Sequence, residues 1–326
     1  LYDYDRDTNR ELSKIEGVTS FCHVLTESNT THKSVPMLLS PVSAQNFDSI
    51  YYRKSIITAF KEAGFQTAFF SNQRYNHSFI DFFGMEADTY DFIKEDSQDS
   101  QYNPSDDELL MLVEKELEKG NRKQFIVLHT YGSHFNYRER YPETAAFFLP
   151  DFPVDAEVKY KDNLMNAYDN SIRYTDNFLA RIIHLLKQQQ VDASMLYTSD
   201  HGEDIFDDGR HLFLHASPVP SYYQLHVPLL LWTSDSYREE YPGIEKAASM
   251  NRQKNISSSI SFFQTMMELA GIETPYRNDS LSVTSPLYTE KSRVYLNDHN
   301  EPHSLDDIGM RKEDFEMLKK RGIDAQ

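Results

Sequence analysis

The sequence predicts an α/β fold with a mainly parallel central sheet covered by helices on both faces. Short apolar runs of strand length alternate with longer stretches whose apolar residues recur at helical spacing. The chain has 326 residues, of which 39% are hydrophobic, and this is enough to bury a sizeable core. Strands that alternate with helices in this way are typical of parallel sheets, because the connecting helices cover the faces.

Each element follows from a local pattern. Gly64 is a typical stop signal after a helix, and Ser105-Asp-Asp-Glu108 matches a capping box at the start of another. In chain order we expect a helix at 51–63, a strand at 67–71, a helix at 105–119, a strand at 125–129, a long helix through 168–186, strands at 194–198 and 227–232, and a helix at 258–270. A further helix at about 304–320 has one apolar face, and we expect it to pack on the body as a C-terminal extension over residues 297–326, after a main domain over residues 1–296.

The charge balance excludes some classes of function. The chain has 33 Lys and Arg against 51 Asp and Glu, a formal net charge of −18, which argues against nucleic acid as a partner. No stretch approaches the roughly 18–20 consecutive apolar residues of a membrane span. The chain opens without an initiator Met or a signal segment, so we expect it to be a piece of a longer protein. Cys22 is the only cysteine, which excludes an internal disulfide.

Polar residues follow three of the predicted strands. Asn72 comes after the first, His134 after the second, and Asp200 with His201 directly after the third. The carboxyl ends of parallel strands meet at one edge of a sheet, where ligands gather, so we expect these side chains to lie together. An Asp oxygen and a His nitrogen suit zinc, with Gly202 allowing a tight turn; the alternative is an ordinary turn with a solvated Asp and a packed His.

The hydroxyl cluster that ends at Thr31 has two interpretations. Hydroxyl residues before an apolar run commonly cap a helix. Alternatively, Thr31 is a nucleophile, because a bound zinc stabilises a threonine alkoxide and a helix N-terminus favours an incoming phosphate. We interpret the neighbouring Lys33, and Arg74 further along the chain, as solvated residues.

In this order the motifs become recognisable as a set. They are Thr31-x-x-Ser34-Val35-Pro36, Ser71-Asn72-Gln73, Gly132-Ser-His134, Asn166-Ala-Tyr-Asp-Asn170, Ser199-Asp200-His201-Gly202-Glu203 and Leu214-His215. Over about residues 1–270 the chain resembles the catalytic domain of the bacterial phosphoethanolamine transferases, within the alkaline phosphatase and sulfatase superfamily.

The resemblance implies a role for each matched residue. It implies that Thr31 accepts phosphoethanolamine and that Asp200 and His201, with Thr31, bind Zn²⁺. His134 and His215 resemble the pair that contacts the transferred phosphate or a second zinc. Asn72 and His77 lie where the family places substrate-contacting groups.

The implied reaction moves phosphoethanolamine from phosphatidylethanolamine to a lipid A phosphate or a cell-envelope glycan. The implied setting is the periplasmic face of the bacterial inner membrane, with an N-terminal membrane anchor elsewhere in the parent protein, and we expect a monomer. Phosphoglycerol transfer, another phosphodiesterase or sulfatase reaction, and a metal-free binding domain are the alternatives.

The chain also departs from the family pattern. The family's first metal ligand is a Glu after an opening strand, upstream of a segment that resembles residues 1–6, and this Glu is absent from the sequence. Members of the family usually carry several disulfides in this domain, which Cys22 alone cannot form. This difference favours branches that modify glycans or core sugars over the colistin-resistance branch.

Overall fold

A computed structural model describes residues 2, 4–94, 103–120 and 123–325 of the chain. Residues 1 and 3, which belong to the opening segment noted above, lie outside this description. The chain divides into two compact units, each built from several stretches of sequence. The first comprises residues 1–16, 64–190 and 205–214, and the second comprises residues 17–63, 191–204 and 215–326.

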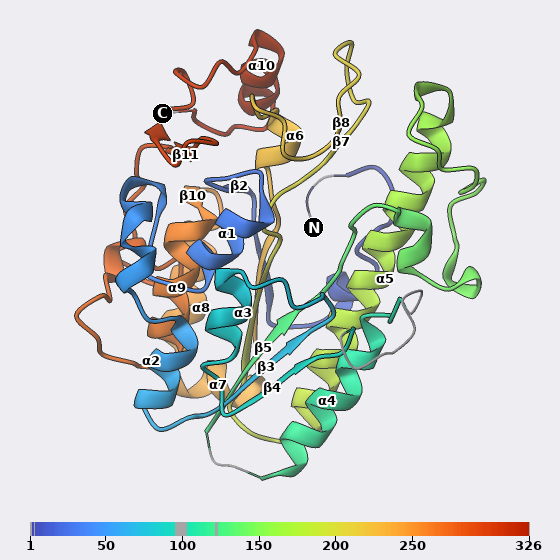
Figure 1. Ribbon diagram of the computed structural model, residues 1–326. Helices are drawn as coiled ribbons and strands as arrows, with labels where there is room; N and C mark the ends of the chain where they lie inside the picture. The colour runs from blue at the N-terminus through green and yellow to red at the C-terminus, as the bar shows by residue number, and fades with distance from the viewer. Residues whose placement is uncertain (1, 3, 95–102, 121–122, 326) are drawn as a thin grey trace. The chain divides into compact units, whose positions relative to one another are not determined.

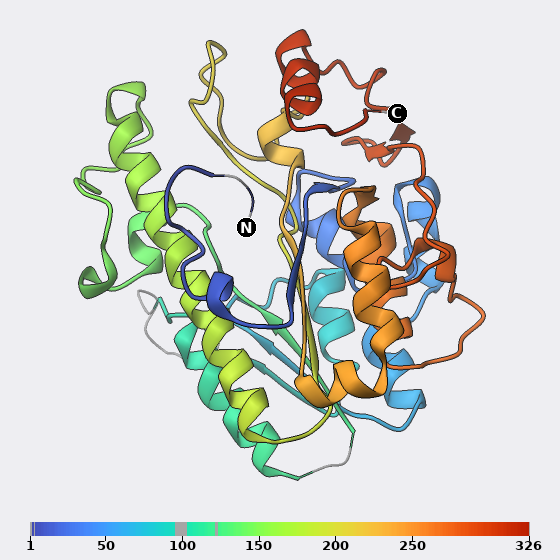
Figure 2. The same cartoon turned by 180° about the vertical axis from the view of Figure 1, so that it is seen from behind.

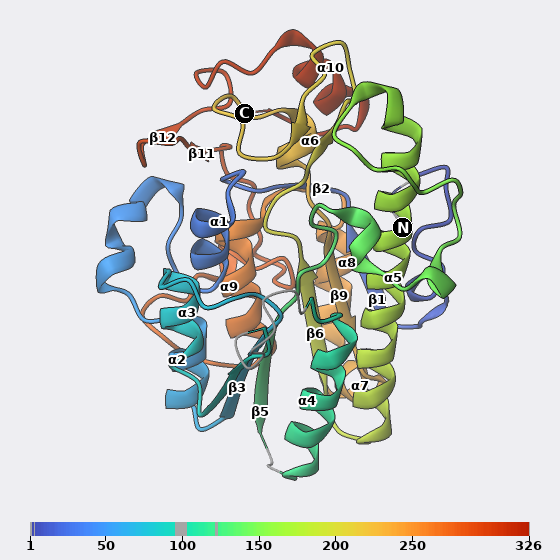
Figure 3. The ribbon, with the colours of Figure 1, turned by 45° about the vertical axis from the view of Figure 1, so that its right-hand side comes forward.

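The first unit is built on a three-stranded parallel sheet in the order β4-β3-β5. Its central strand, β3, is buried from Thr67 to Ser71, as expected for a parallel strand covered on both faces. Helices α4 and α5 run beside this sheet (Figures 1 and 3). The elements of this unit are β3 (Gln66–Ser71), α3 (Phe79–Gly84), β4 (Thr89–Phe92), α4 (Asp107–Glu118), β5 (Gln124–His129), α5 (Lys161–Gln188) and β8 (Phe213–Leu214).

The second unit contains a three-stranded sheet in the order β1-β9-β6 and a parallel pair of β2 with β10. Its central strand β9 is buried throughout and runs antiparallel to both neighbours. Its elements are β1 (Val18–Phe21), β2 (His23–Leu25), α1 (Thr31–Leu38), α2 (Ile56–Glu62), β6 (Ser194–Thr198), α6 (Tyr222–Leu225), β9 (Leu229–Thr233), α7 (Asp235–Glu240), α8 (Pro242–Asn251), β10 (Asn255–Ser257), α9 (Ser258–Leu269), β11 (Tyr295–Leu296), β12 (Pro302–His303) and α10 (Lys312–Lys320). The short strand β7 (Asp204–Ile205) lies where the chain passes from the second unit to the first.

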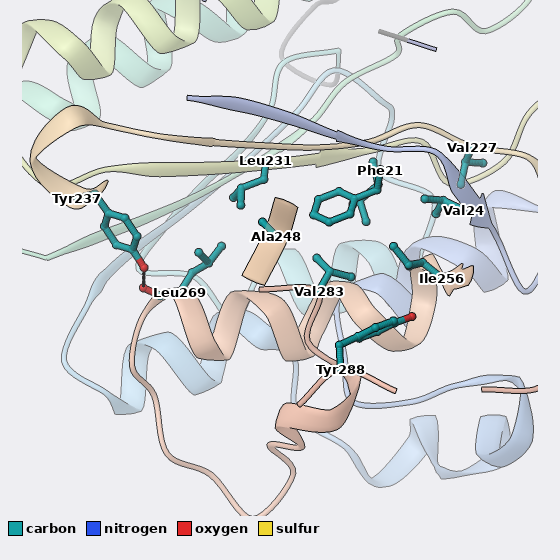
Figure 4. Packing of buried hydrophobic residues seen from close by; sticks show 11 residues of the cluster. Phe21, Val24, Val227, Leu231, Tyr237, Ala248, Ile256, Leu269, Val283 and Tyr288 are labelled. Carbon is teal, nitrogen blue, oxygen red and sulfur yellow. Dashed lines mark hydrogen bonds between the residues drawn. The ribbon is translucent and has the colours of Figure 1, made fainter. Parts of the chain in front are cut away.

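An apolar cluster joins this sheet to its helices. Phe21 and Leu231 from the strands pack with Ala248 of α8 and Leu269 of α9, as Figure 4 shows. The Tyr237 hydroxyl donates a hydrogen bond to the Leu269 carbonyl at 2.7 Å, so the polar end of this buried ring is satisfied. The view from behind shows α8 and α9 in orange beside the sheet (Figure 2).

The C-terminal stretch packs into the second unit. Leu305 and Leu318 are buried in one cluster with Leu25 and Tyr222, so α10 covers part of this unit's core. The predicted domain boundary between residues 296 and 297 stays a prediction. It marks the start of a segment that lies beyond the resemblance to the family, whereas the two units of the structure are separated by how the chain packs.

The α/β class is confirmed, and the strand predicted at 194–198 has the same bounds as β6. The helix start predicted at Ser105 is confirmed in part, because Ser105 Oγ accepts a hydrogen bond from the Asp107 backbone N–H at 3.3 Å. The reciprocal bond from Glu108 that would complete a capping box stays a prediction. The carboxylate of the neighbouring Asp106 accepts from the backbone N–H groups of Tyr131 and Gly132 at 2.8 and 2.9 Å. Within the described residues, no helix is both long enough and apolar enough to cross a membrane.

Candidate active site

The second unit brings Thr31, Asp200 and His201 together. Thr31 is the first residue of α1, and Asp200 and His201 follow β6 directly. The Thr31 Oγ1 atom lies 3.1 Å from His201 Nε2, and Asp200 Oδ2 lies 3.3 Å from the same nitrogen. Two segments 170 residues apart in the sequence therefore place a hydroxyl, a carboxylate and an imidazole around one point.

The position of Thr31 depends on how α1 begins. Thr30 occupies the N-cap position with extended backbone angles, but its side chain makes no capping hydrogen bond. Its hydroxyl lies 3.2 Å from the Ser28 hydroxyl instead. Thr30 is thus the N-cap residue by its backbone conformation, but its hydroxyl does not cap the helix. Thr31 is the first residue inside the helix, where the helix dipole favours a negative charge.

The imidazole of His201 presents a lone pair to this point. Its Nδ1 lies 3.0 Å from the Gly202 carbonyl oxygen, which can only accept, so Nδ1 carries a hydrogen. In the neutral ring Nε2 is then unprotonated and faces both Asp200 Oδ2 and Thr31 Oγ1. The Thr31 hydroxyl can donate a hydrogen bond to this nitrogen, whereas the Asp200 carboxylate oxygen can only accept. The lone pairs of Asp200 Oδ2 and His201 Nε2 repel unless a positive charge, either a proton on Nε2 or a bound cation, lies between them.

These three atoms fit zinc by type and by convergence. Zinc binds Asp oxygen and His nitrogen, and the tautomer of His201 is the one that leaves Nε2 available as a ligand. No group of three or more His, Cys, Asp or Glu side chains arranged for a metal occurs in the described parts of the chain. A zinc ion here would therefore take two ligands of that class, Asp200 and His201, with the Thr31 oxygen as a third.

Gly202 is required for a reason that the sequence did not indicate. We expected a tight turn, but a Cβ atom at this position would lie 2.1 Å from the Tyr223 carbonyl oxygen. The Gly202 N–H also donates to the Gln224 carbonyl at 2.8 Å. Close backbone approach therefore fixes the chain immediately after His201 and explains the glycine.

His215 joins the site through its ring. It packs against the His201 ring with a centroid distance of 3.9 Å, and its Nδ1 lies 3.0 Å from Glu203 Oε1. The Glu203 side chain is buried, so the hydrogen bond between its carboxylate and the His215 ring is charge-assisted and little exposed to water. Glu203 orients His215. Glu203 belongs to the sequence motif that begins at Ser199, but we predicted no role for it from the sequence.

A buried polar network holds the two segments around Thr31 and His215. The Asn29 amide donates to the Ser217 carbonyl and to Gln224 Oε1, at 2.9 and 2.6 Å. The Gln224 amide in turn donates to Asp204 Oδ2 at 2.6 Å, and the Tyr295 hydroxyl donates to Asn29 Oδ1 at 2.7 Å. All of these side chains except that of Ser217 are buried, so the network orders the loop before α1.

Lys33 is buried, so its interpretation as a solvated residue was wrong. Its Nζ donates to the Asn297 carbonyl at 2.6 Å, and burial lowers the pKa of its ammonium group. The lysine ties α1 to the segment before β12. Arg74 is exposed.

Asn72, His77 and His134 belong to the first unit, and their approach to Thr31 stays a prediction. The Asn72 side chain is buried and its amide donates to the Pro104 carbonyl and to Asp106 Oδ1, so only its Oδ1 is left for a substrate. His77 and His134 are exposed.

Comparisons with known proteins identify the family of the chain. A sulfatase family model matches residues 1–272, and the chain therefore belongs to the sulfatase family. Among characterised relatives, phosphoethanolamine transferase EptA of Salmonella typhimurium is 28% identical over 304 residues, covering 88% of this chain and 53% of that protein. Phosphoethanolamine transferase EptC of Escherichia coli is 25% identical over 317 residues, covering 94% of this chain and 54% of that protein. The chain thus spans about half the length of the curated relatives it matches.

Solved structures establish the fold independently. The C-terminal periplasmic domain of Escherichia coli EptC, in complex with Zn, matches with a TM-score of 0.84 and 24% identity, over 95% of this chain and 88% of that one. The soluble domain of lipooligosaccharide phosphoethanolamine transferase A from Neisseria meningitidis matches with a TM-score of 0.76 and 23% identity, over 86% of each chain. The predicted alkaline phosphatase/sulfatase-like fold is confirmed.

Proposed function

We propose that this chain is the catalytic domain of a phosphoethanolamine transferase that acts through a covalent adduct on Thr31. The observation that supports this most strongly is the 3.1 Å approach of Thr31 Oγ1 to His201 Nε2, with Asp200 beside it. The similar proteins EptA and EptC are named as phosphoethanolamine transferases, and the solved domain of EptC is described as periplasmic. We propose the same group and location here.

The reaction has two steps at one phosphorus atom. The Thr31 oxygen attacks the phosphorus of phosphatidylethanolamine, the bond to the glycerol oxygen breaks, and diacylglycerol leaves with the proton that Thr31 loses. An oxygen of the acceptor, a lipid A phosphate or a glycan hydroxyl, then attacks the same phosphorus. The bond between phosphorus and the Thr31 oxygen breaks, and Thr31 takes up a proton, which a hydroxyl acceptor loses. The helix N-terminus at Thr31 stabilises the negative charge of the phosphoryl oxygens in both steps.

Asp200, His201 and Thr31 are the residues that would hold zinc. A bound zinc ion supplies Lewis-acid chemistry and lowers the pKa of a coordinated hydroxyl. His215, fixed by Glu203, presents its ring beside His201 and can move the proton between Thr31 and the leaving or entering oxygen. We propose that His134 contacts the phosphoryl oxygens and that Asn72 and His77 contact the substrate.

A donor-lipid assay tests the proposal. The natural full-length protein is mixed with phosphatidylethanolamine or phosphatidylglycerol, and the release of diacylglycerol is measured for wild type, Thr31→Ser and Thr31→Ala. We expect release from phosphatidylethanolamine by wild type, slower release by Thr31→Ser and background release by Thr31→Ala. Undiminished release by Thr31→Ala would refute the nucleophile, and a preference for phosphatidylglycerol would make the enzyme a phosphoglycerol transferase.

A further inference from the structure

One loop of the first unit exposes three large apolar side chains. Phe147, Leu149 and Phe152 are 55%, 66% and 70% exposed, and we call residues 147–153 the apolar loop. It is part of the green segment that precedes α5 in the chain (Figures 1 and 3). Single exposed apolar side chains are ordinary, but three within six residues concentrate exposed apolar surface on one loop, and exposed apolar surface of this kind marks an interaction site.

The apolar loop is held in place by Asn170 of α5. The side-chain oxygen of Asn170, Oδ1, accepts hydrogen bonds from the backbone N–H groups of Phe147 and Phe148, at 3.0 and 2.8 Å. Its amide donates to the Phe148 carbonyl and to the Tyr141 hydroxyl, at 3.0 and 3.2 Å. Every hydrogen-bonding site of this buried amide is therefore used, and the start of the loop is fixed.

Two more asparagines on the same face of α5 hold the rest of the loop. Asn166 donates to the Pro150 carbonyl at 2.7 Å, and Asn163 donates to the Pro153 carbonyl at 3.1 Å. Residues spaced by three and four lie on one side of a helix. This gives the motif that ends at Asn170 a role: its side chains hold the backbone of the loop in the conformation in which Phe147, Leu149 and Phe152 are exposed.

The charges around the apolar loop indicate which kind of surface it fits. The guanidinium of Arg173 lies 4.1 Å from the centre of the Phe147 ring, and that of Arg6 lies 3.9 Å from the Phe148 ring. Both arginines also face a carboxylate, Asp7 and Asp169 respectively. The base of the loop is thus charged but nearly balanced, whereas the whole chain has a net charge of −18.

A surface with negative charge would repel this protein. An apolar surface bordered by headgroups of zero net charge would accept aromatic rings and leave the arginine pairs at headgroup level. We propose that the apolar loop inserts its three side chains into the headgroup boundary of a zwitterionic phospholipid surface. This inference rests on the proposed function, because the proposed donor is a phospholipid and the enzyme must therefore work at a lipid surface.

Fluorescence of a tryptophan placed in the loop tests the insertion. Trp232, the only tryptophan of the chain, is fully buried, so a spectral change in Phe152→Trp reports on the loop. The chain is titrated with vesicles of phosphatidylcholine and phosphatidylethanolamine. We expect a blue shift that persists in high salt, and weaker partitioning when anionic lipid is added.

Matched variants in the Phe152→Trp background identify the residues responsible. Phe147→Ser with Leu149→Ser should weaken partitioning by about tenfold or more, since each removes an inserted apolar side chain. The control is Met250→Ser with Leu287→Ser, two side chains of the second unit that are 59% and 64% exposed, and it should partition like the parent. Unchanged thermal unfolding midpoints verify that all variants fold.

Three outcomes would overturn the proposal. They are no blue shift at high lipid concentration, an equal loss in the control pair, or a blue shift that depends on protein concentration without vesicles, which would make a second copy the occupant. Thr31→Ala in the same background separates this inference from the transferase proposal. Thr31→Ala should partition like its parent although it is inactive. A parent protein that partitions but shows no transferase activity would overturn the proposed function and leave the role of the apolar loop intact.

Discussion

Glu27 links the segment before Thr31 to the pH dependence of stability. Its side chain is fully buried, one carboxyl oxygen accepts from the Ala44 N–H at 3.1 Å, and the other has no hydrogen-bond partner among the described residues. Burial raises its pKa from the ordinary value of 4.5 to about 7, although the nearby Arg293 opposes the change. The folded chain therefore holds a proton on Glu27 that the unfolded chain releases at lower pH.

The sign follows from proton binding. Between the unfolded and folded pKa values the native state binds more protons, so the stability is fully present below pH 4.5 and falls as the pH rises through about 7. The difference between the two pKa values lowers the free energy of unfolding by about 2 to 3 kcal/mol between about pH 5 and about pH 8. Glu27→Gln keeps the shape without the ionisation, so its stability relative to wild type should increase by this amount over the interval.

Urea unfolding of both proteins at the two pH values measures this difference. Comparing the variant with wild type cancels other titrations, including that of His226, whose pKa is lowered to about 4 by burial. Glu240→Gln, at an exposed position of α7, is the control and should show no such change. A stability difference between Glu27→Gln and wild type that is equal at both pH values would refute the buried-carboxyl reasoning.

Two further predictions concern Glu203 and Gly202, which lie next to the candidate site residues in the chain. Glu203→Gln should lower kcat by about 10- to 100-fold, because the charge-assisted bond to His215 is weakened. Glu301→Gln, which changes an exposed carboxylate facing a different histidine, should leave kcat unchanged in the same assay, and equal effects would contradict the orienting role. Gly202→Ala should destabilise the chain by about 2 kcal/mol or more, measured by thermal unfolding, because its Cβ meets a backbone carbonyl. Gly209→Ala has nothing within 4 Å of the new carbon and should unfold like wild type; an equally stable Gly202→Ala protein would count against the close approach.

Local pattern was sufficient to predict most of the elements. The apolar run at 194–198 became β6, and the helical spacing through 168–186 became the middle of α5. The strand β1 was missed because Val18-Thr-Ser-Phe21 is short and half polar. The antiparallel direction of β9 was not predictable, since direction depends on long-range pairing and leaves no mark in a five-residue strand.

The residues of the candidate site could be proposed from the sequence, but their contacts could not. Thr31, Asp200 and His201 could be proposed because their types suit one chemistry and their motifs resemble a family. The bond between Glu203 and His215 spans 12 residues with no periodic spacing, so only the folded chain reveals it. Lys33 was misinterpreted for the same reason, because its partner, the Asn297 carbonyl, lies 264 residues away.

Mass spectrometry of the peptide that contains Thr31 tests the central claim most directly. The full-length protein is mixed with phosphatidylethanolamine without an acceptor, quenched, digested and analysed for attached phosphoethanolamine. The proposed mechanism predicts the modification on the Thr31 hydroxyl in wild type and none in Thr31→Ala. Modification at a different side chain, or turnover of the lipid while every peptide stays unmodified, would contradict it.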